Sequence, residues 1–99
     1  MDLATFTDSL GEAEPPAGLS RPLQALWWAG RGDWGRAHGL AQAAPGPEAA
    51  WVHAHLHREE GDLGNANFWY SRAGRPMSGD SLEQEWRAIA AELLAGRGR

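Results

Sequence analysis

Hydrophobic residues recur at helical spacing along most of this chain. Near the N-terminus, Leu3, Phe6 and Leu10 stand at positions i, i+3 and i+7, which predicts a short amphipathic helix over residues 2–10. Residues 12–18 then form a linker, because its two adjacent prolines lack the amide hydrogen that a helix needs. The pattern therefore predicts one short helix, followed by a break.

Two similar segments follow the linker. Residues 23–47 and 52–76 align without gaps, 29 positions apart. A repeat of this kind indicates one supersecondary unit that is used twice. The identical pairs are Ala25/Ala54, Gly32/Gly61, Asp33/Asp62, Gly35/Gly64, Ala37/Ala66, Ala44/Ala73 and Pro47/Pro76.

A Gly-Asp pair in each segment predicts a sharp turn between two helices. Gly32 and Gly61 suit the left-handed conformation just after a helix end, since glycine has no Cβ to clash there. Asp33 and Asp62 suit the N-cap of the next helix, because a carboxylate accepts hydrogen bonds from its free amides. The sequence thus predicts two antiparallel helix hairpins, at about residues 20–45 and 47–74.

A last amphipathic helix is predicted over about residues 80–95, where it is expected to cover the open end of the second hairpin. Asp80 is its expected N-cap, with Glu83 three residues later in a capping box. Glu83 and Glu85 are both expected to face solvent. The apolar positions of this helix recur three or four residues apart: Leu82, Trp86, Ile89 and Leu93.

The second hairpin resembles the second half of a tetratricopeptide-like repeat, through Gly61, Asp62, Leu63, Ala66, Tyr70 and Ala73. The first hairpin has Ala41 where the family has an aromatic residue, and neither hairpin has the tryptophan–leucine–glycine signature of the first helix. The resemblance covers about 55 residues. It implies a right-handed array of hairpins, and repeats of this family are usually non-enzymatic scaffolds for protein interaction.

Composition supports a single all-α domain over residues 1–99. β-Branched residues, which strands prefer, are scarce: valine and isoleucine occur once each. Six tryptophans supply large buried side chains to a small, alanine-rich core. The expected fold is therefore a right-handed tetratricopeptide-like array of two hairpins, with a short N-terminal helix and a C-terminal capping helix.

Charge and motif content exclude several functional classes. The net charge is −4 and the nine basic residues, all arginines, are scattered, which disfavours nucleic-acid binding. No apolar run approaches the roughly 20 residues of a membrane helix, and the N-terminus lacks the features of a signal peptide. Cysteine is absent, so thiolate metal sites are excluded. A cytoplasmic protein without a cofactor is expected.

Three histidines lie close together at positions 53, 55 and 57, but a helix divides them. His53 and His57, at i and i+4, share one face with Glu60, while His55 lies on the opposite face. Histidines at this spacing can chelate a divalent metal ion, and Glu60 offers an oxygen ligand. His38 is the remaining nitrogen ligand, although nothing in the sequence places it nearby.

The alternative interpretation of His53 and His57 is structural, and the sequence favours it. In the tetratricopeptide-like register, both positions face the second helix of the same hairpin, near Tyr70. There an imidazole packs flat and forms a hydrogen bond with a hydroxyl, a carboxylate or a carbonyl group. We therefore expect no metal and no catalytic residue, with a metal-binding or hydrolytic site at His53, His57 and Glu60 as the alternative.

Two aromatic residues fall on polar helix faces and are predicted to contact a partner protein. Phe68 lies beside Arg72, and Trp51 lies beside Arg58. Tryptophan, tyrosine and arginine dominate the energetics of protein interfaces. Two repeat units are also fewer than the roughly three that such arrays need for stability. The sequence therefore predicts a protein-interaction module, with a homodimer as one possible assembly.

Overall fold

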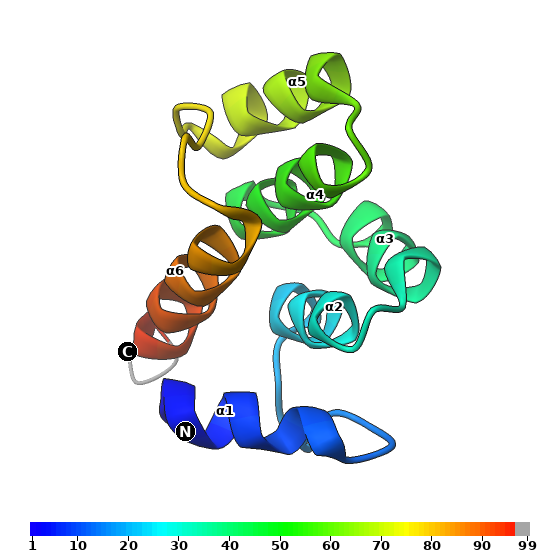
Figure 1. The fold of residues 1–99 in the computed structure, drawn as a ribbon, viewed down its shortest axis with the longest axis vertical. Helices are drawn as coiled ribbons and strands as arrows, with labels where there is room; N and C mark the ends of the chain where they lie inside the picture. The colour runs from blue at the N-terminus through cyan, green and yellow to red at the C-terminus, as the bar shows by residue number, and fades with distance from the viewer. Residues whose placement is uncertain (97–99) are drawn as a thin grey trace.

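A computed structural model describes residues 1–96, and all of its regular structure over this range is helical, as the sequence predicts (Figure 1). None of these helices combines the length and the apolar character needed to cross a bilayer. The elements are α1 (Leu3–Asp8), a 3₁₀ turn (Ser9–Gly11), α2 (Arg21–Gly30), α3 (Trp34–Ala43), α4 (Pro47–Glu59), α5 (Leu63–Ala73) and α6 (Leu82–Gly96).

Both Gly-Asp pairs end one helix and begin the next, as predicted. Gly32 and Gly61 have φ values of 83° and 85°, in the region that favours glycine. The carboxylates of Asp33 and Asp62 each accept a hydrogen bond of 3.1 Å from the amide three residues later. These turns fix where α3 and α5 begin, and therefore which of their side chains face α4.

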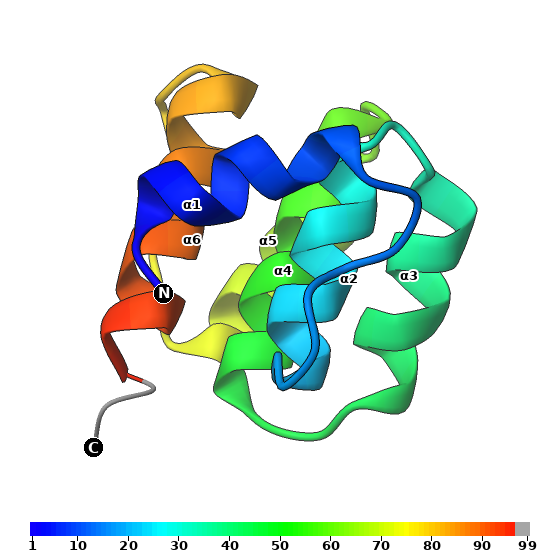
Figure 2. The same ribbon diagram turned by 90° about the horizontal axis from the view of Figure 1, so that it is seen from below.

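The helices from α2 to α5 pack in chain order, and α6 folds back across them. Helix α2 packs against α3, α3 against α4, and α4 against α5 (Figure 1). Helix α6 packs mainly against α4, α2 and α1, so it does not extend the array beyond α5. Figure 2 shows α1 lying across α6 and the end of α2. Helix α4 is therefore covered on several sides.

Helix α6 begins one residue later than the sequence suggests, and with a different capping box. The hydroxyl of Ser81 accepts a hydrogen bond from the amide of Gln84 (3.1 Å), and the side chain of Gln84 accepts one from the amide of Ser81 (3.2 Å). Each residue satisfies a free amide of the other. The predicted cap, Asp80 with Glu83, is therefore wrong. Asp80 instead offers its backbone carbonyl to Arg58.

Tryptophans join the N-terminal segment and α6 to α2. The indole N–H of the fully buried Trp27 donates to the hydroxyl of Ser9 (2.9 Å), and that of Trp86 donates to the carbonyl of Leu26 (2.8 Å). Phe6 stacks against Trp86, with 5.6 Å between ring centroids. Because a buried indole needs a partner for its N–H, these bonds fix how α1 and α6 sit on α2.

Candidate metal centre

Three imidazoles from two helices meet at one side of α4. His53 and His57 lie one turn apart on α4 with stacked rings, 4.9 Å between centroids. His38 comes from α3, and its Nε2 lies 3.1 Å from Nε2 of His53. One potential ligand atom from each of the three residues lies within 4.8 Å of the other two. We call His38, His53 and His57 the histidine cluster.

Two tryptophans hold the histidine cluster in place. Trp34, one turn before His38 on α3, stacks on its imidazole with 4.6 Å between centroids and 10° between the planes. The indole N–H of Trp34 also donates to the carbonyl of Leu56 (2.8 Å), which binds α3 to α4. On the other side, Trp69 of α5 stacks on His53 with centroids 3.9 Å apart. Helices α3, α4 and α5 all position these rings.

Glu60 orients His57 through a hydrogen bond to its ring. Nδ1 of His57 lies 2.6 Å from Oε1 of Glu60. An ionised carboxylate only accepts hydrogen bonds, so the proton of a neutral His57 sits on Nδ1 and the lone pair on Nε2. A carboxylate in this position is typical of histidine ligands in metal sites. Glu60 therefore supports a histidine ligand in this structure, whereas the sequence hypothesis made it an oxygen ligand.

Burial keeps two members of the histidine cluster, His38 and His53, neutral. Burial, followed by the nearby charges of His38 and His57, lowers the pKa of His53 to about 4. Burial and the charge of His57 also lower the pKa of His38, partly opposed by Glu60. Both imidazoles are therefore uncharged at neutral pH, which is the protonation state that binds a metal ion.

His53 carries the buried polar atom that lacks a partner. Its side chain is buried, with a residue exposure of 3%, and Nδ1 has no hydrogen-bond partner within residues 1–96. The Nε2 atoms of His53 and His38 face each other, so only one of them donates in that contact. An unpaired buried polar group costs roughly 1–3 kcal/mol. The unpaired Nδ1 of His53 therefore lowers the stability of the fold.

A second set of potential ligands is already occupied. His57, Glu60 and Asp62 also place ligand atoms within 4.8 Å of one another. However, both oxygens of Asp62 accept hydrogen bonds from Asn65, where they cap α5. Glu60 is held by His57. The histidine cluster is thus the better candidate for a metal ion.

One nitrogen pair of the histidine cluster has the ligand spacing of a tetrahedral metal ion. At Zn–N distances near 2.0–2.1 Å, two ligand nitrogens stand about 3.3 Å apart. The Nε2 atoms of His38 and His53 are 3.1 Å apart. Neutral imidazole is a ligand for zinc, copper, iron and nickel. The structure therefore brings the predicted pair His53 and His57 together with His38, which the sequence left unplaced.

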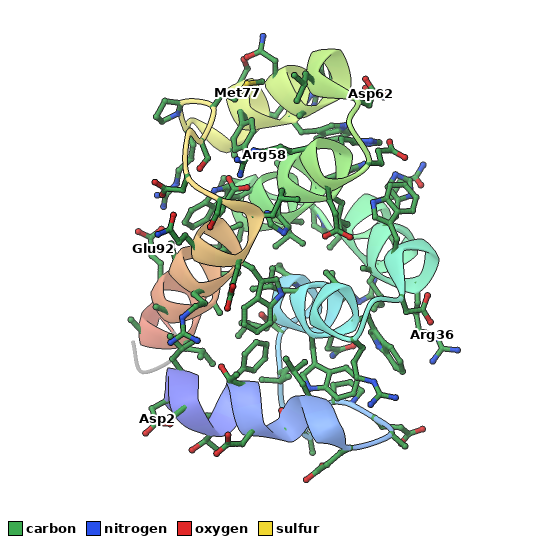
Figure 3. The ribbon with its side chains drawn as sticks, in the orientation of Figure 1. Asp2, Arg36, Arg58, Asp62, Met77 and Glu92 are labelled. Atoms are coloured by element: carbon green, nitrogen blue, oxygen red, sulfur yellow. The ribbon has the colours of Figure 1, made fainter. Side chains whose placement is uncertain are left out.

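The opposite side of α4 carries a second polar cluster, centred on the buried Glu85 of α6. His55 donates from Nδ1 to Oε1 of Glu85 (2.7 Å), which also accepts from Arg58 (3.0 Å). The hydroxyl of Tyr70 donates to the other oxygen. We call these four residues the Glu85 network. Figure 3 shows Arg58 beside α4, on the side towards α5.

Hydrogen bonds keep Glu85 ionised despite its burial. Burial by itself raises the pKa of Glu85, but hydrogen bonds from His55, Tyr70 and Arg58 lower it below the ordinary value. Conversely, burial and the bond to Glu85 raise the pKa of Tyr70. The buried carboxylate is thus matched by an adjacent arginine and satisfied on both oxygens. This arrangement locks α6 to α4 and α5.

The expected solvent exposure of Glu85 is wrong. Glu85, expected at the surface, is 3% exposed, and His55 is 1% exposed. Both form hydrogen bonds that helical periodicity within one helix does not reveal. Tyr70 donates its hydroxyl to Glu85, and the expected hydrogen-bond partner of His57 is a carboxylate, that of Glu60. The sequence signal for Glu85 was its position directly before Trp86, on the edge of the apolar face of α6.

Two of the four predicted partner-binding residues are not available at the surface. Trp51 is buried, and the guanidinium of Arg75 lies 3.7 Å from its ring centroid. Arg58 belongs to the Glu85 network. The other two, Phe68 and Arg72, are exposed on α5, with the Arg72 guanidinium 5.0 Å from the Phe68 ring centroid.

No protein-family model matches this chain, and no significant match is found among the curated proteins or the solved structures. The tetratricopeptide-like resemblance accordingly stays a prediction from the sequence.

Proposed function

We propose that this protein binds one divalent transition-metal ion, of which Zn²⁺ is the first to test, through His38, His53 and His57. The carrying observation is the convergence of three imidazoles from two helices, each with a potential ligand atom within 4.8 Å of the others. The supporting carboxylate of Glu60, which leaves the lone pair of His57 on Nε2, favours the same proposal. This was the less favoured sequence hypothesis, now with His38 in place of Glu60.

The expected consequence of metal binding is a stabilised contact between α3 and α4. These helices belong to different predicted hairpins, and two hairpins alone bury little apolar surface. An ion that binds only the folded chain stabilises it by about 2.7 kcal/mol when its free concentration is 100 times Kd. We therefore propose a helical scaffold whose two hairpins are held together by a metal ion.

The test is a Zn²⁺ titration of protein that carries no polyhistidine tag, followed by calorimetry and by thermal unfolding. One ion is expected to bind per chain and to raise Tm. The His38→Ala variant should lose both effects. Gln42→Ala, which alters an exposed residue of the same helix, is the matched control and should bind Zn²⁺ like the unmodified protein. Equal Zn²⁺ affinity of His38→Ala and the unmodified protein contradicts the proposal.

We propose protein contact through α5 as a second candidate function. The observation that favours it is the exposure of large apolar side chains on this helix, 56% for Leu63 and 49% for Phe68, with Arg72 beside the latter. A second copy of the chain is the first partner to test. Sedimentation at high micromolar concentration should detect a dimer that Phe68→Ala weakens, and a monomer at all concentrations counts against it.

A further inference from the structure

We infer that the metal centre keeps one coordination position for a ligand from outside the chain, and that it prefers a small anionic donor. This inference rests on the proposed metal binding at the histidine cluster. Tetrahedral sites with four protein ligands are structural, whereas sites with three protein ligands leave the fourth position to water or substrate. The number of protein ligands therefore decides whether the metal ion only stabilises the fold or can also bind an external ligand.

Within residues 1–96, no further histidine or carboxylate completes the cluster. The three nitrogens form a set that no fourth side chain of these types joins. The sequence contains no cysteine. Glu60, the nearest supporting carboxylate, is bound to Nδ1 of His57, and Asp62 is bound to Asn65. Residues 1–96 thus supply three nitrogen ligands, and no fourth histidine or carboxylate joins them.

One side of the histidine cluster reaches solvent. His53 and His57 are buried, but His38 is half-buried, and Glu60 is exposed at the end of α4. The turn that follows is also exposed, and Figure 3 shows Asp62 at this outer tip. A small ligand can therefore approach from the α4–α5 turn, while Trp34 and Trp69 cover two other sides.

The charge balance of the centre favours an anion. A divalent ion held by three neutral imidazoles keeps its charge of +2, and the ionised carboxylate of Glu60 compensates only one unit. The stacked rings of Trp34 and Trp69 exclude water on their sides. Charge interactions are stronger where water is excluded. The fourth ligand is therefore expected to be a small anionic oxygen or nitrogen donor, in exchange with water.

The experiment uses Co²⁺ as a spectroscopic probe and azide as the anion. Cobalt in a tetrahedral site absorbs visible light, and the band responds to each change of ligand. Addition of Co²⁺ to the full chain is expected to give this band, and His38→Ala should abolish it. Azide should then shift the band of the loaded protein with saturable 1:1 behaviour. Absence of a cobalt band overturns the proposed metal site itself.

A cobalt band that does not respond to azide, even at a large excess, overturns the inference while leaving the metal site intact. Glu60→Gln, studied at saturating Co²⁺, is expected to bind azide more tightly, because it removes the compensating negative charge. Glu59→Gln, one residue earlier on α4, should bind azide like the unmodified protein. Unchanged azide affinity in Glu60→Gln contradicts the proposed preference for anions.

Discussion

Helix α4 carries two buried polar clusters on opposite sides, and they differ in how their polar groups are satisfied. In the Glu85 network, an ionised carboxylate accepts hydrogen bonds on both oxygens and faces an arginine. In the histidine cluster, two imidazoles face each other through equivalent nitrogens, and Nδ1 of His53 has no partner. The unpaired atom lies on His53, which is as buried as Glu85, so its lack of a partner does not arise from exposure.

This difference separates a structural role from a binding role. Buried polar groups are nearly always paired, since each unpaired group costs free energy. The Glu85 network meets this rule using only residues of the chain. The histidine cluster leaves ligand nitrogens close together without a full set of donors and acceptors. A metal ion would accept the lone pairs of both facing Nε2 atoms, so the histidine cluster is the one that suggests a ligand.

The largest expected effect is a loss of folding stability when the Glu85 network is disrupted. Glu85→Ala leaves His55, Arg58 and Tyr70 without their common acceptor, and removing one partner of a buried ion pair typically costs about 3–5 kcal/mol. The free energy of unfolding, measured with urea, should fall by about this amount. Zn²⁺ affinity, measured in the folded fraction, should stay unchanged.

Glu83→Ala is the control for this variant, since Glu83 is exposed on the same helix. Surface substitutions of this kind usually change stability by less than about 0.5 kcal/mol. Similar losses for the two variants would contradict the structural role of the Glu85 network.

The next effect is a loss of stability in acid that originates in the histidine cluster. In the folded chain the pKa of His53 is about 4, below the ordinary value of 6.5, because the ring is buried. The unfolded chain therefore binds a proton first as the pH falls, so this stability is complete above pH 6.5 and is lost towards pH 4. We expect a loss of about 1–3 kcal/mol.

Carboxylates also titrate in this range, so the measurement is a comparison with His53→Phe, which retains an aromatic ring against Trp69. Urea unfolding at several pH values, without metal, should show a smaller loss for His53→Phe between pH 6.5 and pH 4. Parallel pH curves for the two proteins would place the acid sensitivity elsewhere.

The sequence predicted the helices and the part of the site that lies on α4. It did not predict the contacts between residues that are distant in the chain. The i, i+4 pair His53 and His57 and the Gly-Asp turns depend on local spacing, which a sequence displays. The position of His38 beside this pair depends on the packing of α3 against α4, which local spacing does not reveal. The sequence signal that could have placed His38 in the cluster was its position on α3, one turn after Trp34.

Glu85 was misplaced for a related reason. Helical periodicity put this carboxylate at the edge of an apolar stripe, where it is normally solvated. Its burial depends on His55, Arg58 and Tyr70, which lie 15 to 30 residues away in the chain. Charge compensation of this kind becomes visible only when α4, α5 and α6 are placed together.

A smaller effect should follow from removing the carboxylate that supports His57. Glu60→Gln keeps the shape of the side chain but weakens the acceptor at Nδ1 of His57. Loss of such supporting groups typically lowers metal affinity 10- to 100-fold. Competition with a chromogenic Zn²⁺ chelator should measure a Kd increased by roughly this factor. An unchanged Kd would mean that Glu60 does not support the ligand.

The smallest effect is expected at the neighbouring glutamate, which contacts the other cluster. Oε2 of Glu59 lies 3.8 Å from Nε2 of His55, beyond hydrogen-bond distance, and 35% of the side chain is exposed. Ion pairs this exposed contribute less than about 1 kcal/mol. Glu59→Gln should therefore lower the free energy of unfolding by less than about 0.5 kcal/mol and leave the Zn²⁺ Kd unchanged. Glu59 and Glu60 are adjacent in the chain. The two variants Glu59→Gln and Glu60→Gln therefore compare the same substitution near the Glu85 network and at the histidine cluster. A weaker Zn²⁺ affinity in Glu59→Gln would show that the two sides of α4 are coupled.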